Sequence, residues 1–135
     1  MSMHPGQMAN SAYQPSRPAQ RPGGRPVEAP AFRVLVHRQY HEKYTRLAEV
    51  VGIKQAQELW DYLAMTPDKP PLVGACCILK GKAGDPQDVG WSKTRHYEAS
   101  SKVRIDYQFN REYRTAEGGD PHPVVAIMTI TFSSH

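Results

Sequence analysis

Cysteine is scarce in this 135-residue chain, and long hydrophobic runs are absent. The two cysteines, Cys76 and Cys77, are neighbours, so they cannot form a spaced disulfide framework, and no second pair accompanies them for a zinc site. We expect both to be reduced and buried. No run approaches the roughly 18 apolar residues that a membrane-spanning helix needs, and residues 1–10 lack the basic and apolar regions of a signal peptide. A cytoplasmic protein with no membrane segment is therefore expected.

Aliphatic side chains are nearly missing from the first 30 residues. This segment contains six of the twelve prolines and three of the ten glycines. A segment of this composition buries too little apolar surface to offset the conformational entropy that folding removes. The sequence therefore predicts a disordered tail over residues 1–31 and one folded domain over residues 32–135.

A strong excess of either charge is also absent, because 17 Lys and Arg residues oppose 13 Asp and Glu residues, for a net charge of +4. The distribution is less even than the total. Residues 80–104 contain six basic and three acidic residues, so this stretch is locally +3. Such a run either forms an ordinary solvated surface or binds an anionic partner.

The spacing of apolar residues predicts a mixed fold. Alternation at Phe32, Val34 and Val36 predicts a first strand. Helical spacing predicts helices over residues 39–51 and 53–66, separated by Gly52 and ended by Pro67, although one long helix kinked at Gly52 is an alternative. Further strands are predicted over residues 72–79, 91–98, 102–109 and 124–132. The fold class is therefore α+β: an N-terminal strand, a two-helix hairpin and an antiparallel sheet, with the helices on one face and the other face open.

The strand over residues 102–109 has an apolar and a polar side. The side expected to face the helices consists of Val103, Ile105, Tyr107 and Phe109. The side expected to face away consists of Arg104, Asp106 and Gln108. The polar side is where we look for binding or catalytic groups.

The preceding strand has the same alternation. Arg95 and Tyr97 share one face, whereas His96 and Glu98 share the other. Because only a short link joins the two strands, we expect Arg95 and Tyr97 to lie close to Arg104. Arginine guanidinium groups bind phosphate in a bidentate manner and a tyrosine ring stacks on an unpaired base, so this grouping suits a phosphodiester. Ordinary residues on a solvated sheet face are the alternative.

Two segments carry a family resemblance, together with the order of the elements and the phrase Leu79-Lys80-Gly81. The segments are residues 93–109 (KTRHYEASSKVRIDYQF) and residues 124–132 (VVAIMTITF). Within the first, Val103-Arg104-Ile105-Asp106-Tyr107 is similar to an aromatic-Arg-apolar-apolar-Tyr strand. The chain thereby resembles the RelE/ParE superfamily of bacterial toxins, and the RelE-like ribonuclease branch in particular, over roughly residues 32–135.

RelE-like toxins belong to type II toxin-antitoxin systems and cut messenger RNA in the ribosomal A site. The resemblance implies that the partners are the ribosome, its mRNA and a cognate antitoxin. Arg104 aligns with the arginine that contacts the scissile phosphate. Arg95 and Tyr97 align with positions where the family often has lysines that bind RNA and stabilise the reaction. Arg95 or Lys93 is therefore expected to assist Arg104 in neutralising charge. Tyr97 is a departure that is able to stack or to donate a hydrogen bond, and it is an alternative group for moving protons. His135 follows the last strand, where family members commonly place a basic or imidazole group, and is the candidate general base or acid.

Further basic and imidazole groups are expected to contact RNA. They are Lys80, Lys82, Lys93 and His96, of which His96 is also an alternative group for moving protons. Lys80 and Lys82 are equally compatible with a solvated loop. Asp106 stands where the family usually has an apolar residue, so it either orients Arg104 or serves as a base.

The implied reaction uses the nucleophile that RNA itself carries. The 2′-hydroxyl attacks the scissile phosphate, the protein neutralises the transition-state charge, and a 2′,3′-cyclic phosphate is the expected product. We expect an endoribonuclease without a metal or other cofactor. The alternatives are a ParE-like toxin that inhibits DNA gyrase and a noncatalytic binding module of the same fold.

Overall fold

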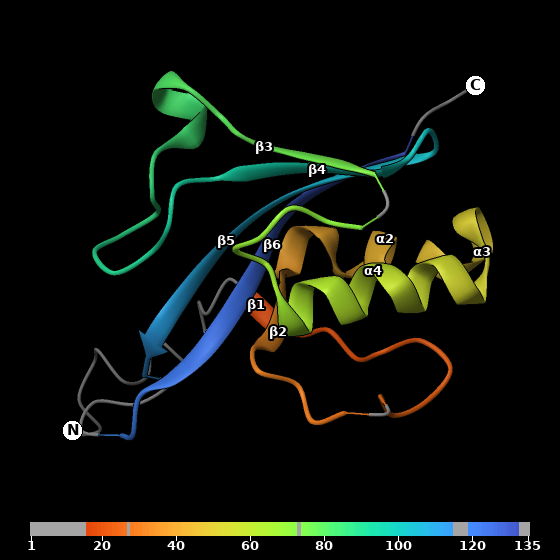
Figure 1. Ribbon diagram of the computed structural model, residues 1–135, viewed down its shortest axis with the longest axis horizontal. Coiled ribbons are helices and arrows are strands. Elements are labelled where there is room, and N and C mark those ends of the chain that lie inside the picture. Colours follow the sequence, from red (N-terminus) through yellow and green to blue (C-terminus); the bar gives the residue numbers. More distant parts are fainter. Residues whose placement is uncertain (1–15, 27, 73, 115–118, 133–135) are drawn as a thin grey trace.

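The computed structural model describes residues 16–26, 28–72, 74–114 and 119–132. Within these residues, the chain forms strands, short helical segments and one longer helix (Figure 1). The strands are β1 (Ser16–Pro18), β2 (Arg33–His37), β3 (Ala75–Ile78), β4 (Arg95–Ser100), β5 (Val103–Tyr113) and β6 (His122–Phe132). The α-helices are α2 (His41–Thr45), α3 (Leu47–Val51) and α4 (Ile53–Met65), and the 3₁₀ helices are η1 (Arg38–Tyr40) and η2 (Gly81–Gly84).

The described strands form one sheet in the order β1-β2-β6-β5-β4-β3. All neighbouring pairs are antiparallel except β2 and β6, which run parallel. A parallel pair requires a crossover connection, and the helices supply part of it. The predicted α+β class is confirmed, with a mostly antiparallel sheet.

The core lies between the helices and one face of the sheet. Val103, Ile105 and Tyr107 are fully buried there, as the alternation of β5 predicts. From the helical side, α4 contributes Leu59 and Leu63, which are at most 1% exposed. Burying a leucine side chain contributes about 2 kcal/mol of transfer free energy, so this contact holds the longest helix on the sheet.

The predicted first helix is divided into short pieces. Residues 38–51 form η1, α2 and α3, with a break at Arg46, where φ is −95° and ψ is 1°. The Arg46 amide N–H approaches the carbonyl oxygens of both Glu42 (3.3 Å) and Lys43 (3.1 Å), which tightens the chain there. Gly52 separates α3 from α4 at φ +89°, a backbone conformation that favours glycine.

Part of the predicted disordered tail is ordered. Residues 16–26, which we call the strap, add β1 to the sheet and cross the helices. The Trp60 indole N–H donates to the Ala19 carbonyl oxygen (2.7 Å), the Tyr44 hydroxyl donates to the Gln20 carbonyl oxygen (2.5 Å), and two hydrogen bonds join Arg21 to Asp61. The prediction of disorder is therefore wrong for the strap, because backbone hydrogen bonds and one ion pair replace the apolar burial that its composition cannot supply. Residues 1–15 lie outside the described residues.

The cysteines were expected to be buried, and this is also wrong. They lie on β3, the last strand of the sheet order, where Cys76 is half-buried and Cys77 is exposed. An edge strand has only one hydrogen-bonded neighbour, and its side chains are covered less completely than those of a central strand. Both thiols are free.

None of the helices in the described parts of the chain is both long enough and apolar enough to cross a lipid bilayer.

Candidate functional site

The register of the β4–β5 hairpin decides which polar residues meet. His96 lies opposite Asp106, and Glu98 lies opposite Arg104. Directly opposite residues of an antiparallel pair point to the same side of the sheet. These four side chains therefore share the face that points away from the helices, and we call them the imidazole cluster.

The imidazole cluster has a defined geometry. Nδ1 of His96 lies 2.6 Å from Oδ1 of Asp106, and Nε2 of the same ring lies 3.7 Å from Oε1 of Glu98. That Glu98 oxygen also lies 3.6 Å from Nε of Arg104. The side chains of His96 and Asp106, which we call the His96–Asp106 dyad, are 28% and 25% exposed. The dyad is therefore partly shielded but still accessible to solvent.

This arrangement has a clear chemical meaning for the ring. When Nδ1–H donates to Asp106, the other nitrogen, Nε2, is left unprotonated in the neutral ring and is able to accept a proton. Arg104 stands beside it through Glu98 and supplies a fixed positive charge. A proton acceptor and a cation on one sheet face are the groups that a phosphodiester reaction uses.

The carboxylate oxygens of the imidazole cluster lie around the His96 ring and do not converge on one point where a metal ion could bind. Asp106 approaches one ring nitrogen and Glu98 approaches the other, on opposite sides of the ring. Across residues 16–26, 28–72, 74–114 and 119–132, no set of three His, Cys, Asp or Glu side chains is placed to hold a metal ion.

Two predicted site residues lie on the other face. Tyr97 lies opposite Ile105 and is 4% exposed, with its ring 4.8 Å from that of Tyr62 between the centroids. Burial raises the pKa of Tyr97 to about 12, so its hydroxyl holds its proton near neutral pH. The guanidinium carbon of Arg95 lies 5.5 Å from the ring centroid of Phe109. The expected grouping of Arg95 and Tyr97 with Arg104 is wrong, because the register pairs Arg104 with Glu98 instead.

The predicted lysines are exposed near the beginning of β4. Lys82 belongs to η2, while the Leu79 amide donates to the Thr94 carbonyl oxygen (2.9 Å) and thereby brings Lys80 next to Lys93. His96, expected to bind RNA with them, lies within β4 on the face that points away from the helices. His135 lies outside the described residues.

Gln108 is a structural residue that the sequence does not single out. It is 2% exposed and fastens the loop after η2 to the sheet. Its Oε1 accepts from the Gln87 amide (2.9 Å), and its Nε2 donates to the Asp85 carbonyl oxygen (2.9 Å) and to Oγ1 of Thr94 (2.8 Å). The expectation of a wholly open face is therefore wrong, since this loop covers part of it beside the imidazole cluster. Only the tertiary hydrogen bonds distinguish Gln108 from an ordinary polar residue.

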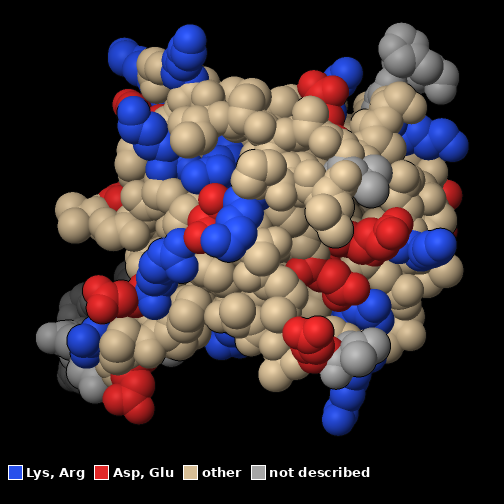
Figure 2. All heavy atoms as spheres, in the orientation of Figure 1, with Lys and Arg blue, Asp and Glu red and all other residues tan. Residues whose placement is uncertain are grey.

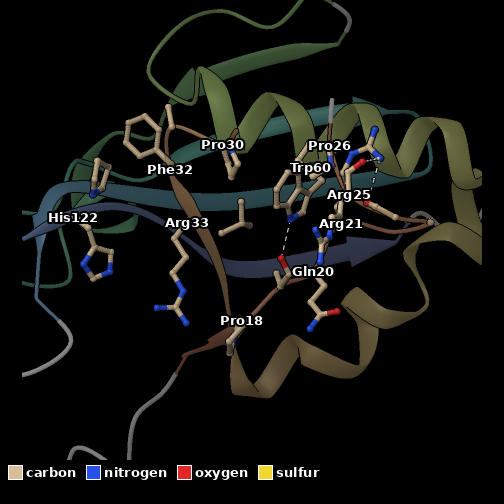
Figure 3. A pocket seen from close by; sticks show the side chains of 16 residues that line it. Pro18, Gln20, Arg21, Arg25, Pro26, Pro30, Phe32, Arg33, Trp60 and His122 are labelled. Atoms are coloured by element: carbon tan, nitrogen blue, oxygen red, sulfur yellow. Dashed lines mark hydrogen bonds between the residues drawn. The ribbon is translucent and has the colours of Figure 1, made fainter. Parts of the chain in front are cut away.

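A cavity of about 800 Å³ lies beneath the strap (Figure 3). Strap residues form one wall, and Phe32, Trp60 and His122 contribute to the others. None of the predicted site residues that the structure describes lines this cavity. The imidazole cluster is therefore the better candidate for chemistry.

Comparisons with family models, with curated proteins and with solved structures found no match to this chain.

Proposed function

We propose that this protein is a RelE-like endoribonuclease toxin that cleaves messenger RNA at the imidazole cluster. The single observation that supports this most is the His96–Asp106 dyad beside Arg104 on an accessible sheet face. The order of elements supports it further: a strand, helical segments and then antiparallel strands, with the resembling segment 93–109 folded as the β4–β5 hairpin.

The proposed reaction begins at the 2′-hydroxyl of RNA. His96 takes its proton at Nε2 while Asp106 holds the ring through Nδ1. The 2′-oxygen forms a bond to phosphorus, the bond from phosphorus to the 5′-oxygen breaks, and the 5′-oxygen receives a proton. His135 is the residue that we propose for this second transfer. The products are a 2′,3′-cyclic phosphate and a free 5′-hydroxyl.

Arg104 binds the phosphate in this proposal. In the free protein its Nε lies 3.6 Å from Glu98, with both side chains almost half exposed. An exposed ion pair of this kind contributes at most about 1 kcal/mol, so a phosphate displaces Glu98 at little cost. A guanidinium placed against the transition state stabilises the charge that develops on the phosphate oxygens.

The cellular context follows from the same resemblance. The protein acts in the cytoplasm on ribosome-bound mRNA and is neutralised by a cognate antitoxin. Tyr97 has no proton-transfer role in this proposal, because its hydroxyl is buried on the helix side.

The test compares matched variants in a bacterial host. Wild type, Arg104→Ala and His96→Asn are induced, growth is followed and the 5′ ends of RNA are mapped. We expect arrest with cuts inside translated messages for the wild type and neither effect for the two variants. Arg46→Ala is the matched control, because Arg46 is also an exposed arginine paired with a glutamate, Glu49, but lies on the helical side.

The other outcomes separate the alternatives. Arrest without RNA cuts, retained in Arg104→Ala, would indicate a ParE-like action on gyrase. Folded protein that neither arrests growth nor cuts RNA, with or without added ribosomes, would contradict a nuclease and indicate a binding module.

A further inference from the structure

A row of basic side chains lies on the other face of the same hairpin. It consists of Lys80, Lys93, Arg95 and Arg111, which we call the basic row. Figure 2 shows blue side chains gathered over the η2 end of β4 and continuing toward β5. In Figure 1 the helices lie toward the opposite end of the sheet.

Strand alternation places the row on one face. Oγ1 of Thr94 accepts a hydrogen bond from Gln108 and thus lies on the side of the imidazole cluster. Arg95, the first residue of β4, lies opposite Tyr107 and therefore on the helix side, and the exposed Lys93 precedes it by two residues. The Ser92 amide donates to the Phe109 carbonyl oxygen (2.8 Å), which keeps this segment beside β5. The row consequently crosses adjacent chain segments whose spacing is about 4.8 Å.

Phe109 organises two of the four cations. Its ring centroid lies 5.5 Å from the guanidinium carbon of Arg95 and 5.4 Å from that of Arg111. The ring is itself held by Phe32, at 6.0 Å between centroids in an edge-on arrangement. Two guanidinium groups on one supported ring form a preorganised surface on which a nucleic-acid base can stack.

Most cations of the basic row are not paired with a carboxylate and are therefore available to bind phosphate. Among the described residues, Lys80, Lys93 and Arg95 form no ion pair. Arg111 donates to Asp68 at 2.6 Å. Desolvation is the largest single influence on Asp68 and opposes its ionisation, but the hydrogen bond from Arg111, a backbone hydrogen bond and the charges of Arg111 and Lys69 together lower the pKa of the carboxyl below its ordinary value. Asp68 therefore fixes Arg111 in place as a charged partner.

We propose that the basic row binds a stretch of single-stranded RNA on the face of the sheet opposite the imidazole cluster. Phosphates contact Lys80, Lys93 and Arg95, and one base stacks on the guanidinium groups at Phe109. A basic surface with an aromatic-supported stacking position matches single strands, whose bases are exposed for stacking. This inference extends the proposed function, but binding at the row does not require the chemistry at His96.

The test measures binding of a short, unstructured, fluorescein-labelled uridine-rich RNA by anisotropy over a range of salt concentrations. Three phosphate contacts predict a slope of log K against log salt of about −2. Arg95→Ala should weaken binding about tenfold and make the slope shallower by about 0.7. Arg95→Lys should keep the slope and still weaken binding, because ammonium supplies charge without a stacking plane. Circular dichroism confirms that each variant is folded.

Two sets of controls make the outcomes distinguishable. Lys54→Ala removes an exposed charge from α4 and should leave RNA binding unchanged. The assay itself is the second control, because anisotropy measures binding and not cleavage, so failure of the nuclease proposal does not affect this one. Unchanged binding in Arg95→Ala and Arg111→Ala would overturn the row as an RNA site. Tighter binding of duplex RNA, or of an acidic peptide instead of RNA, would overturn the choice of single-stranded RNA.

Discussion

The two faces of the β4–β5 hairpin differ although one alternating sequence builds both. On the helix side, Ile105 and Tyr107 are fully buried and define the core. On the opposite side, Arg104 and Asp106 stay accessible and meet polar partners from β4. The helix side is therefore sensitive to polarity and volume, whereas the opposite side is free to carry charged groups at little cost in stability. Function and stability are separated within single strands.

The largest effect is expected from reversing the polarity of the helix side. Ile105→Asp places a carboxylate at a fully buried position with no charged partner facing it from the same strand. Because burying an unpaired charge costs several kcal/mol, and domains of this kind have about 5–15 kcal/mol of stability, we expect loss of the native fold. Near-ultraviolet circular dichroism and urea unfolding measure this. Asp106→Asn, a change at the neighbouring residue, should fold normally. An equal loss of stability in both variants would show that the two faces of β5 do not differ in their sensitivity to polarity.

The next effect concerns activity on the opposite side. Arg104→Ala should reduce RNA cleavage by about a hundredfold or more, because it removes the proposed phosphate ligand. It should change the free energy of unfolding by at most about 1 kcal/mol, since its ion pair with Glu98 is largely exposed. Cleavage assays and urea unfolding of the same preparation test both statements. A loss of activity that tracks a loss of stability would argue against a functional role.

An intermediate effect is expected where the strap meets the helices. Trp60→Phe removes the indole N–H that donates to the Ala19 carbonyl oxygen and leaves that buried acceptor without a donor. This should cost about 1–3 kcal/mol. Limited proteolysis should then cut within residues 16–26 faster than in the wild type. An unchanged rate of proteolysis within residues 16–26 would show that the order of the strap does not depend on this hydrogen bond.

The smallest effect is expected from an exposed neighbour of the imidazole cluster. Thr131 lies opposite Arg104 in the sheet and is exposed. Thr131→Ala should change the free energy of unfolding by no more than about 0.5 kcal/mol, as is usual for surface substitutions. Thermal unfolding provides the measurement, and a markedly lower melting temperature would show that this face contributes more to stability than its exposure indicates.

Much of the local structure could be predicted from the sequence. The end of α4 near Pro67 follows from the ring of proline, and the two sides of β5 follow from alternation between Val103 and Phe109. The pairing of His96 with Asp106 could not be predicted in this way, because alternation assigns faces but not register. In the structure Glu98 lies opposite Arg104. Shifting the pairing of β4 with β5 by one residue would place Tyr97 there instead.

The sequence by itself determined the α+β class, the end of α4 and the two sides of β5, because these depend on residues close together in the chain. Only the tertiary structure decided that the strap is ordered, that Gln108 fastens a loop over the sheet, and that the imidazole cluster and the basic row lie on opposite faces. Each of these depends on hydrogen bonds and strand pairings between distant segments, which local periodicity does not record.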